Sequence, residues 1–122
     1  VAAGRKTLEI LGRDGIYEAL EAAGSQLATG LMEIAARHGR VLTVGRIGSM
    51  MCPYFSPVMP RNLTDVTATD REGWVRFFNE MLSRGVLMPP SPYEAFFLSV
   101  EHDRGVLDRV LDAADASFAA IA

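Results

Sequence analysis

Residues 41–55, VLTVGRIGSMMCPYF, decide the fold of this chain. The stretch begins and ends with apolar runs, VLTV and MMCPYF, and two glycines lie between them. This pattern predicts a β-hairpin that turns near Gly48 and Ser49. Because Pro53 cannot donate a backbone hydrogen bond, we expect the second strand to be at a sheet edge, or to bulge, at this residue.

Two helical segments are predicted before the hairpin. From Ile16 to His38 apolar residues recur at three- and four-residue intervals, which is typical of one long amphipathic helix. Asp14 can cap its start, and Gly39 supplies a stop signal at its end. A shorter helix is predicted for residues 1–11.

The segment after the hairpin alternates helix and strand. Residues 56–68 are rich in turn formers and are predicted to form a loop. Thr69 followed by Glu72 is a capping-box pattern for a helix that ends at Gly85, and Asp103 can cap a last helix. The helix before Gly85 carries an apolar stripe of Trp74, Phe77, Phe78, Met81 and Leu82. Short strands are predicted at residues 86–88 and 95–100.

These elements predict an α+β fold, in which helices cover a small, largely antiparallel sheet. With 122 residues, 49% of them hydrophobic, the chain is long enough to bury the core of one domain. The aromatic stripe could be a platform for stacking nucleobases, but its helical spacing indicates that it belongs to the core.

Composition excludes several classes of partner. The net charge is -3 and the arginines are scattered, which argues against nucleic-acid binding. No apolar run is long enough to cross a membrane. A single cysteine, Cys52, suits a reducing compartment, so we expect a cytoplasmic protein. The opening sequence VAAGRKTL has no initiator methionine and no cap, and we expect it to be cut from a longer chain.

Residues that bind metals or act as nucleophiles form no known motif here. The strong nitrogen and sulfur ligands are His38, His102 and Cys52, and their spacing matches no zinc pattern, so no metal site is expected. No serine lies in a Gly-x-Ser-x-Gly motif. Lys6 is the only lysine, and we expect it on the exposed side of the first helix, where nothing would desolvate it as a Schiff-base lysine requires.

Glu94 is the carboxylate that the sequence singles out. It follows the proline-rich segment PPSPY, residues 89–93, and comes just before an apolar run. Prolines restrict the backbone and make this approach rigid. A rigid loop that presents one acid among apolar neighbours suits a general acid or a hydrogen-bond acceptor. A solvated loop glutamate is the alternative reading.

Several motifs follow one another along the chain in a recognisable order. They are VGRIGSM at 44–50, Arg61-Asn62, Phe77-Phe78, Gly85-Val86, PPSPYEAFFLS at 89–99, and His102. Together they resemble the C-terminal domain of the glutamate-1-semialdehyde 2,1-aminomutase family, and the resemblance covers essentially the whole chain. Its most specific part is the Pro-Ser-x-Tyr-Glu-Ala segment with the upstream Gly-Ser-Met.

The resemblance implies the small domain of a fold-type I, class III aminotransferase. Members of the aminomutase family are dimeric and use pyridoxal phosphate (PLP) to convert glutamate-1-semialdehyde into 5-aminolevulinate for tetrapyrrole (porphyrin) synthesis. It implies that residues 1–122 are a single C-terminal small domain, and that the large PLP-binding domain with the Schiff-base lysine is absent from this chain. No residue of this chain would then bind the cofactor, and the chain alone would be inactive.

The same resemblance assigns roles within the loop. Glu94 would be catalytic, facing the active site as a hydrogen-bonding or proton-handling partner of the substrate or cofactor amine. Ser91 and Tyr93 would be substrate-binding residues and would shape the loop of Glu94. The partners would be the missing large domain and a second subunit, with neither nucleic acid nor membrane involved.

The chain departs from the family pattern at Met51, Pro53, Pro92 and Phe96. If Phe96 crowds the site, the enzyme would be another class III aminotransferase that acts on a different amino compound. Two other hypotheses remain open: a free-standing α+β ligand-binding module, and a structural or interaction domain without a site.

Overall fold

The computed structural model describes all residues, 1–122, and contains a three-stranded sheet with helices packed on it. The elements are α1 (Ala2–Leu11), α2 (Ile16–Arg37), β1 (Thr43–Ile47), β2 (Met50–Tyr54), α3 (Leu63–Thr67), α4 (Arg71–Ser83), β3 (Phe96–Phe97) and α5 (Arg104–Ile121). The strand order is β1-β2-β3 and both strand pairs are antiparallel. The predicted α+β class, a small antiparallel sheet covered by helices, is therefore confirmed.

The hairpin of β1 and β2 forms as its sequence predicts. The turn falls at Gly48 and Ser49, and Gly48 has a φ of 58°, a conformation that favours glycine. The register between the strands is regular, with Val44 opposite Pro53, so no bulge forms. Strand β2 is the central strand, but β3 pairs only with its residues Met50 and Met51. Pro53 therefore has no strand partner on the side of β3, as expected for a proline at a sheet edge.

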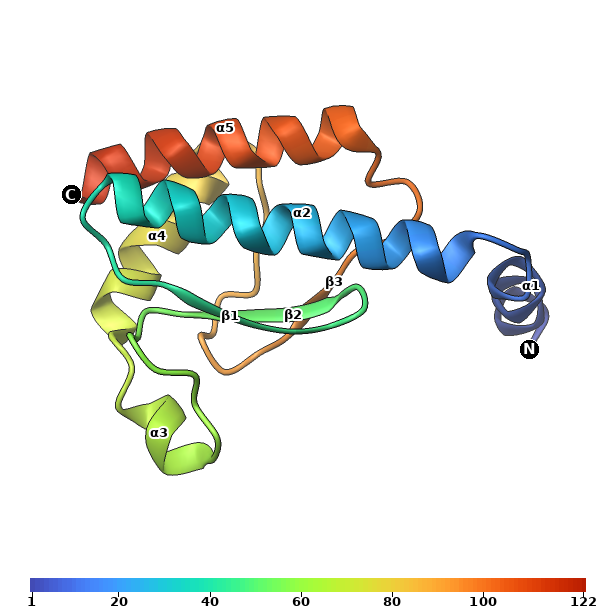
Figure 1. Cartoon of the computed structure of the whole chain (residues 1–122), viewed down its shortest axis with the longest axis horizontal. Helices are drawn as coiled ribbons and strands as arrows, with labels where there is room; N and C mark the ends of the chain where they lie inside the picture. Colours follow the sequence, from blue (N-terminus) through green and yellow to red (C-terminus); the bar gives the residue numbers. More distant parts are fainter.

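Helix α2 lies across one face of the sheet, with α5 beside it and α4 packed against α5 (Figure 1). The helix approaches the hairpin closely at Gly24, where a Cβ atom would be only 2.4 Å from the carbonyl oxygen of Gly48. Arg46 of β1 closes this contact by an ion pair with Glu21 of 2.6 Å. No long helix covers the opposite face, which we call the open face of the sheet (Figure 1).

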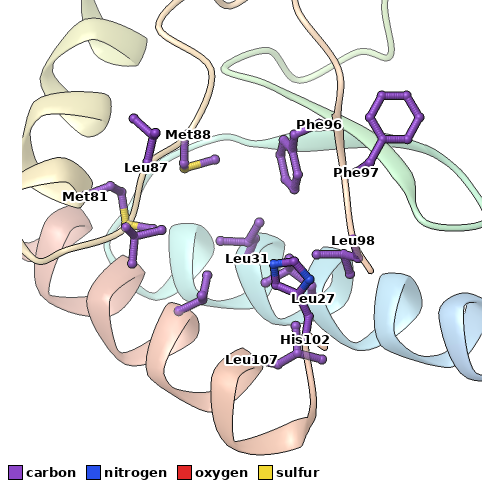
Figure 2. A pocket seen from close by; sticks show the side chains of 12 residues that line it. Leu27, Leu31, Met81, Leu87, Met88, Phe96, Phe97, Leu98, His102 and Leu107 are labelled. Carbon is purple, nitrogen blue, oxygen red and sulfur yellow. The ribbon is translucent and has the colours of Figure 1, made fainter. Parts of the chain in front are cut away.

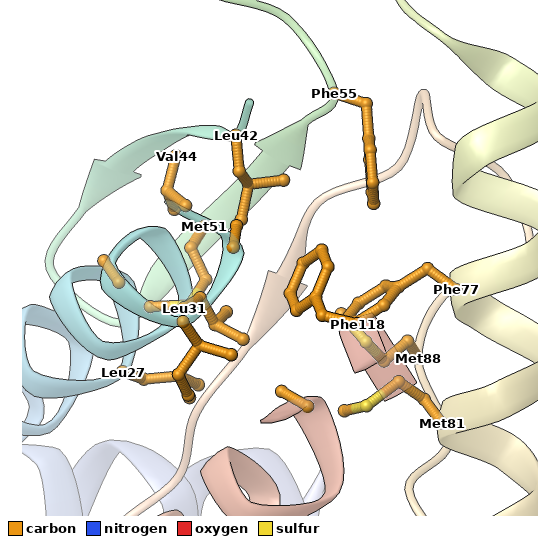
Figure 3. Close-up of a cluster of buried hydrophobic side chains, with 14 of the residues drawn as sticks. Leu27, Leu31, Leu42, Val44, Met51, Phe55, Phe77, Met81, Met88 and Phe118 are labelled. Atoms are coloured by element: carbon orange, nitrogen blue, oxygen red, sulfur yellow. The ribbon is translucent and has the colours of Figure 1, made fainter. Parts of the chain in front are cut away.

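Aromatic side chains fill the core between the sheet, α4 and α5 (Figure 3). Phe77 stacks on Phe118 with ring centroids 4.4 Å apart, and Phe55 packs against both rings. The predicted stripe on α4 therefore belongs to the core: Trp74, Phe77 and Met81 are buried, and Phe78 is partly buried. Leu82 is an exception, since 46% of it is exposed.

Two predicted caps are wrong by one residue. Helix α2 has Gly15 at its N-cap, with a φ of 82° and no side-chain hydrogen bond, so Asp14 does not cap it. Helix α4 is capped by Asp70, whose side chain accepts from the backbone N–H of Gly73, whereas the hydroxyl of Thr69 donates to a backbone oxygen of the preceding turn. The backbone angles of one residue decide a cap, and several polar residues near each start compete for the position. The predicted cap Asp103 is confirmed on α5.

Three other predictions are corrected between β2 and α5. The expected loop at residues 56–68 contains the short helix α3. No strand forms at residues 86–88, because the Val86 N–H bonds back to Met81 and two prolines without an N–H follow. The strand predicted at residues 95–100 shrinks to the two residues of β3.

Candidate functional site

Glu94 lies at the end of a tight turn beside the sheet. Its backbone N–H donates to the carbonyl oxygen of Ser91 at 3.3 Å, which closes the turn. The side chain is exposed, and its carboxylate has no hydrogen bond or ion pair within the chain. The carboxylate is therefore available to a group outside this chain.

Ser91 and Tyr93 belong to the same turn but differ in what they do. The Ser91 hydroxyl accepts a hydrogen bond from the backbone N–H of Tyr93 at 3.2 Å, so it stabilises the turn from within. The side chain of Tyr93 is 47% exposed and stands free at the surface. The structure thus places the three predicted residues together on one short turn.

Cys52 attaches this turn to the sheet, a role that reasoning from the sequence missed. Its thiol lies 3.3 Å from the carbonyl oxygen of Glu94, to which it can donate. Burial raises the pKa of the Cys52 thiol, so the thiol stays protonated at neutral pH. Burial, together with its hydrogen bond to Cys52, raises the pKa of the neighbouring Tyr54 to about 12. The alternation of β2 could have placed Cys52 on the open face, but nothing in the sequence names its partner.

The open face carries a concave surface of about 310 Å³ next to the turn. It lies over the β1–β2 hairpin, with Met59 and Pro60 on one side and Ala95 on the other. Exposed apolar side chains contribute to its lining, among them Ile47, which is 77% exposed, and Met50, which is 36% exposed. This surface is mostly hydrophobic, and Glu94 directly precedes its rim residue Ala95.

A second, smaller cavity of about 130 Å³ lies on the covered side, among α2, α5 and the chain before β3 (Figure 2). Its lining is hydrophobic except for His102, whose Nδ1 already accepts from the Ser99 N–H at 2.9 Å. Phe96 and Phe97 both line this cavity, but Phe96 packs against the core, whereas Phe97 lies on the other side of the β3 backbone and is largely exposed (Figure 2). Phe96 therefore does not crowd the open face.

The remaining titratable groups form no second site. Lys6 is exposed, as its helix position predicts, and forms an ion pair of 2.8 Å with Glu9. His38, at the end of α2, bonds to Asp115 of α5 at 2.8 Å. No three His, Cys, Asp or Glu side chains come together in a way that could hold a metal ion. None of the helices has the length and apolar character needed to cross a membrane.

Two comparisons with known proteins give matches, and no protein-family model matches the chain. Glutamate-1-semialdehyde 2,1-aminomutase of Polynucleobacter asymbioticus is 43% identical over 118 residues, which are 97% of this chain and 27% of that enzyme. The enzyme of the same name from Polynucleobacter necessarius is 42% identical over the same share. The chain thus spans about a quarter of the length of these relatives.

Solved structures agree with this match. The FumI protein of Sphingopyxis sp. MTA144, in its PLP internal aldimine form, superposes with a TM-score of 0.78 and 28% identity, over 98% of this chain and 26% of FumI. A β-phenylalanine aminotransferase from Variovorax paradoxus gives a TM-score of 0.66 and 27% identity, over 80% of this chain and 22% of that enzyme. Over nearly its whole length, the chain is therefore related to the C-terminal part of glutamate-1-semialdehyde 2,1-aminomutases, and it shares the fold of the matching part, about a quarter of the length, of class III PLP-dependent aminotransferases.

Proposed function

We propose that this chain is the small, C-terminal domain of a glutamate-1-semialdehyde 2,1-aminomutase. Such an enzyme isomerises (S)-4-amino-5-oxopentanoate to 5-aminolevulinate. The observation that carries the proposal is the 43% identity to the Polynucleobacter asymbioticus enzyme over 118 residues. Residues 1–122 would form one domain, and a large domain of the same enzyme would supply the PLP site.

The residues of this chain do not fit PLP by themselves. The cofactor needs a lysine amine for its Schiff base and a set of donors for its phosphate. Lys6 is exposed and paired with Glu9, and the glycines at positions 45 and 48 lie in a β-hairpin rather than before a helix N-terminus. We therefore assign no cofactor contact to this chain and expect the isolated chain to be inactive.

Glu94 would be the contribution of this chain to the active site. Its carboxylate is exposed, and a tight turn holds its backbone. Such a group can accept a hydrogen bond from an amine or exchange a proton with it. Ser91 and Tyr93 would support this role by shaping the turn and its surface.

The open face would be the contact surface for the large domain. Exposed Ile47, Met50 and Phe97 form an apolar area there, and such areas mark interaction surfaces. The whole enzyme would be a homodimer. We place it in the cytoplasm, because the free thiol of Cys52 suits a reducing compartment.

A chimeric enzyme tests the proposal directly. The C-terminal 27% of the Polynucleobacter asymbioticus enzyme, the share that this chain matches, is replaced by residues 1–122. We expect the purified chimera to form 5-aminolevulinate from glutamate-1-semialdehyde. A folded, PLP-loaded chimera that acts only on another amino substrate would overturn the aminomutase assignment and favour another class III aminotransferase.

The role of Glu94 is tested in the same chimera. Glu94→Gln removes the charge and the basic oxygen but preserves the shape, so we expect kcat to fall about 10²- to 10⁴-fold, the usual contribution of a proton-transferring group. Glu101→Gln is the matched control, because Glu101 is also an exposed glutamate near β3. Equal turnover of both variants and the unmodified chimera would show that Glu94 has no catalytic part.

A further inference from the structure

The pairing of β2 with β3 has a definite hydrogen-bond register. Met50 lies opposite Phe97 and Met51 opposite Phe96, and the Leu98 N–H donates to the Ser49 carbonyl at 3.0 Å. In an antiparallel ladder, hydrogen-bonded and non-bonded pairs alternate. Ser49 and Leu98 form a bonded position, so Met51 with Phe96 is the next one. If the register continued, the bonded position after that would pair Pro53 with Glu94.

Neither hydrogen bond of this last pair forms. Pro53 has no N–H to donate to the Glu94 carbonyl. The Glu94 N–H donates to Ser91 instead, at 3.3 Å. The Glu94 carbonyl oxygen lies 3.3 Å from the Cys52 thiol, which replaces the missing backbone donor. Strand pairing therefore ends at Phe96, and the turn that carries Glu94 lies just before it.

The alternation of side chains shows why this ending matters. Residues two apart on a strand point to the same face of the sheet. Phe96 points to the covered face, where it packs against the core. If pairing continued to position 94, Glu94 would point to the same covered face. A carboxylate there would lie against hydrophobic side chains and would be lost to a site on the open face.

Cys52 is well placed to stabilise the alternative conformation. It alternates with the buried residues Met51 and Pro53, so its side chain lies on the open face. The thiol lies 3.3 Å from the backbone carbonyl oxygen of Glu94 and 4.0 Å from that of Pro92. A protonated thiol is a weak donor that can satisfy one of these carbonyl oxygens.

We propose that Pro53 and Cys52 are positioning residues for Glu94. Pro53 ends the β2–β3 ladder before Glu94 and keeps that carboxylate off the covered face, and the Cys52 thiol holds the released backbone beside the open face. The catalytic consequence rests on the proposed function, whereas the geometry can be tested without it.

Amide exchange in the 122-residue chain tests the geometry by NMR. In Pro53→Val, the new amide at position 53 is expected to be protected from exchange, and the shifts of Glu94 are expected to move toward strand values. Pro57→Val, in an exposed part of the chain, is the control and leaves Glu94 unchanged. An unprotected amide at position 53, with Glu94 shifts as in the unmodified chain, would overturn the role of Pro53.

The thiol contact is tested by two further variants. Cys52→Ala removes the donor, so we expect the carbonyl carbon shift of Glu94 to move and the turn to become more mobile, whereas Cys52→Ser restores a donor and part of the original shift. Identical spectra of Glu94 in the unmodified chain and in the alanine variant would contradict the role of Cys52.

Kinetics of the chimera connect the geometry to catalysis. We expect Pro53→Val to lower kcat on the order of tenfold or more, with a smaller change in KM, because misplacing a reacting group by about an ångström is costly. In the Glu94→Gln background the same change should have little further effect, since both act through one group. Fully additive losses would show that Pro53 does not act through Glu94. A Glu94→Gln variant with normal turnover would overturn the proposed catalytic role, whereas the NMR result decides the geometry separately.

Discussion

The two faces of the sheet in this chain differ in what covers them. On the covered face, Val44 and Met51 are 9% and 1% exposed, because α2 packs over them. On the open face, Ile47 is 77% exposed, although it belongs to β1 like Val44. Phe97 is 65% exposed, although it belongs to β3, which pairs with the strand of Met51. The first face is complete within this chain, and the second has the character of a contact surface.

This difference separates stability from the proposed function. The large buried side chains lie on the covered side, where losing one leaves a cavity. The turn with Glu94 lies beside the open face and is attached by a few hydrogen bonds. Substitutions on the covered side should therefore change the free energy of unfolding, and those on the open face should change association and activity.

The largest expected effect compares two phenylalanines. Phe118 is fully buried and stacks on Phe77 at 4.4 Å, so Phe118→Ala should lower the free energy of unfolding by about 3–5 kcal/mol. Phe97→Ala on the open face should cost less than about 1 kcal/mol, because 65% of this residue is already exposed. Urea unfolding followed by tryptophan fluorescence measures both. Similar losses in the two variants would contradict the distinction between the faces.

A smaller effect is expected where α2 meets the hairpin. A Cβ atom at Gly24 would be 2.4 Å from the Gly48 carbonyl oxygen, so Gly24→Ala must move helix and turn apart. We expect a loss of about 1–3 kcal/mol, as for other overpacked positions. Gly4→Ala in α1, where no atom lies within 4 Å of the added Cβ, is the control and should be neutral or slightly stabilising. A neutral Gly24→Ala would mean that α2 does not rest on the turn.

Charges on the open face should change association with little effect on folding. Ile47→Lys and Phe97→Lys replace exposed apolar groups, and we expect each to change stability by less than about 0.5 kcal/mol. Binding of a hydrophobic dye and self-association of the chain should decrease, as measured by fluorescence and analytical ultracentrifugation. Val44→Lys, on the covered face, should instead unfold the chain. Unchanged dye binding in both open-face variants would place the exposed apolar surface elsewhere.

The smallest expected effect concerns the response of the ion pair between α2 and α5 to acid pH. Hydrogen bonds from His38 and Arg37 lower the pKa of the Asp115 carboxyl from its ordinary value of 3.8. A lowered carboxyl pKa stabilises the fold above the unfolded-state pKa, and the stabilisation disappears as the pH falls through the lower, folded-state value. Asp115→Asn should therefore be less stable than the unmodified chain above about pH 5, and the two should converge below the ordinary pKa. A difference that is constant from neutral to acid pH would argue against this pair.

The helices and the hairpin could be predicted because their signals are local. Apolar periodicity indicated α2, α4 and α5, and two apolar runs separated by glycines indicated β1 and β2. The apolar segment at 86–88 also had the composition of a strand. It forms none, because a strand needs a partner and its first N–H bonds to Met81 instead. The roles of Glu94, Ser91 and Tyr93 remain predictions, although the structure places all three on one turn.

The sequence alone determined that Pro53 cannot donate a hydrogen bond and that a single acid, Glu94, follows a stiff, proline-rich segment. Only the tertiary structure decided that the β2–β3 register, if it continued, would bring these two residues opposite each other. It also decided that the Cys52 thiol bonds to a carbonyl 42 residues further along the chain, and that Phe96 packs inward while Phe97 stays exposed. The physical reason is that backbone angles and hydrogen-bond donors belong to individual residues. Register instead depends on how distant segments pack together, and a shift by one residue would exchange the two faces.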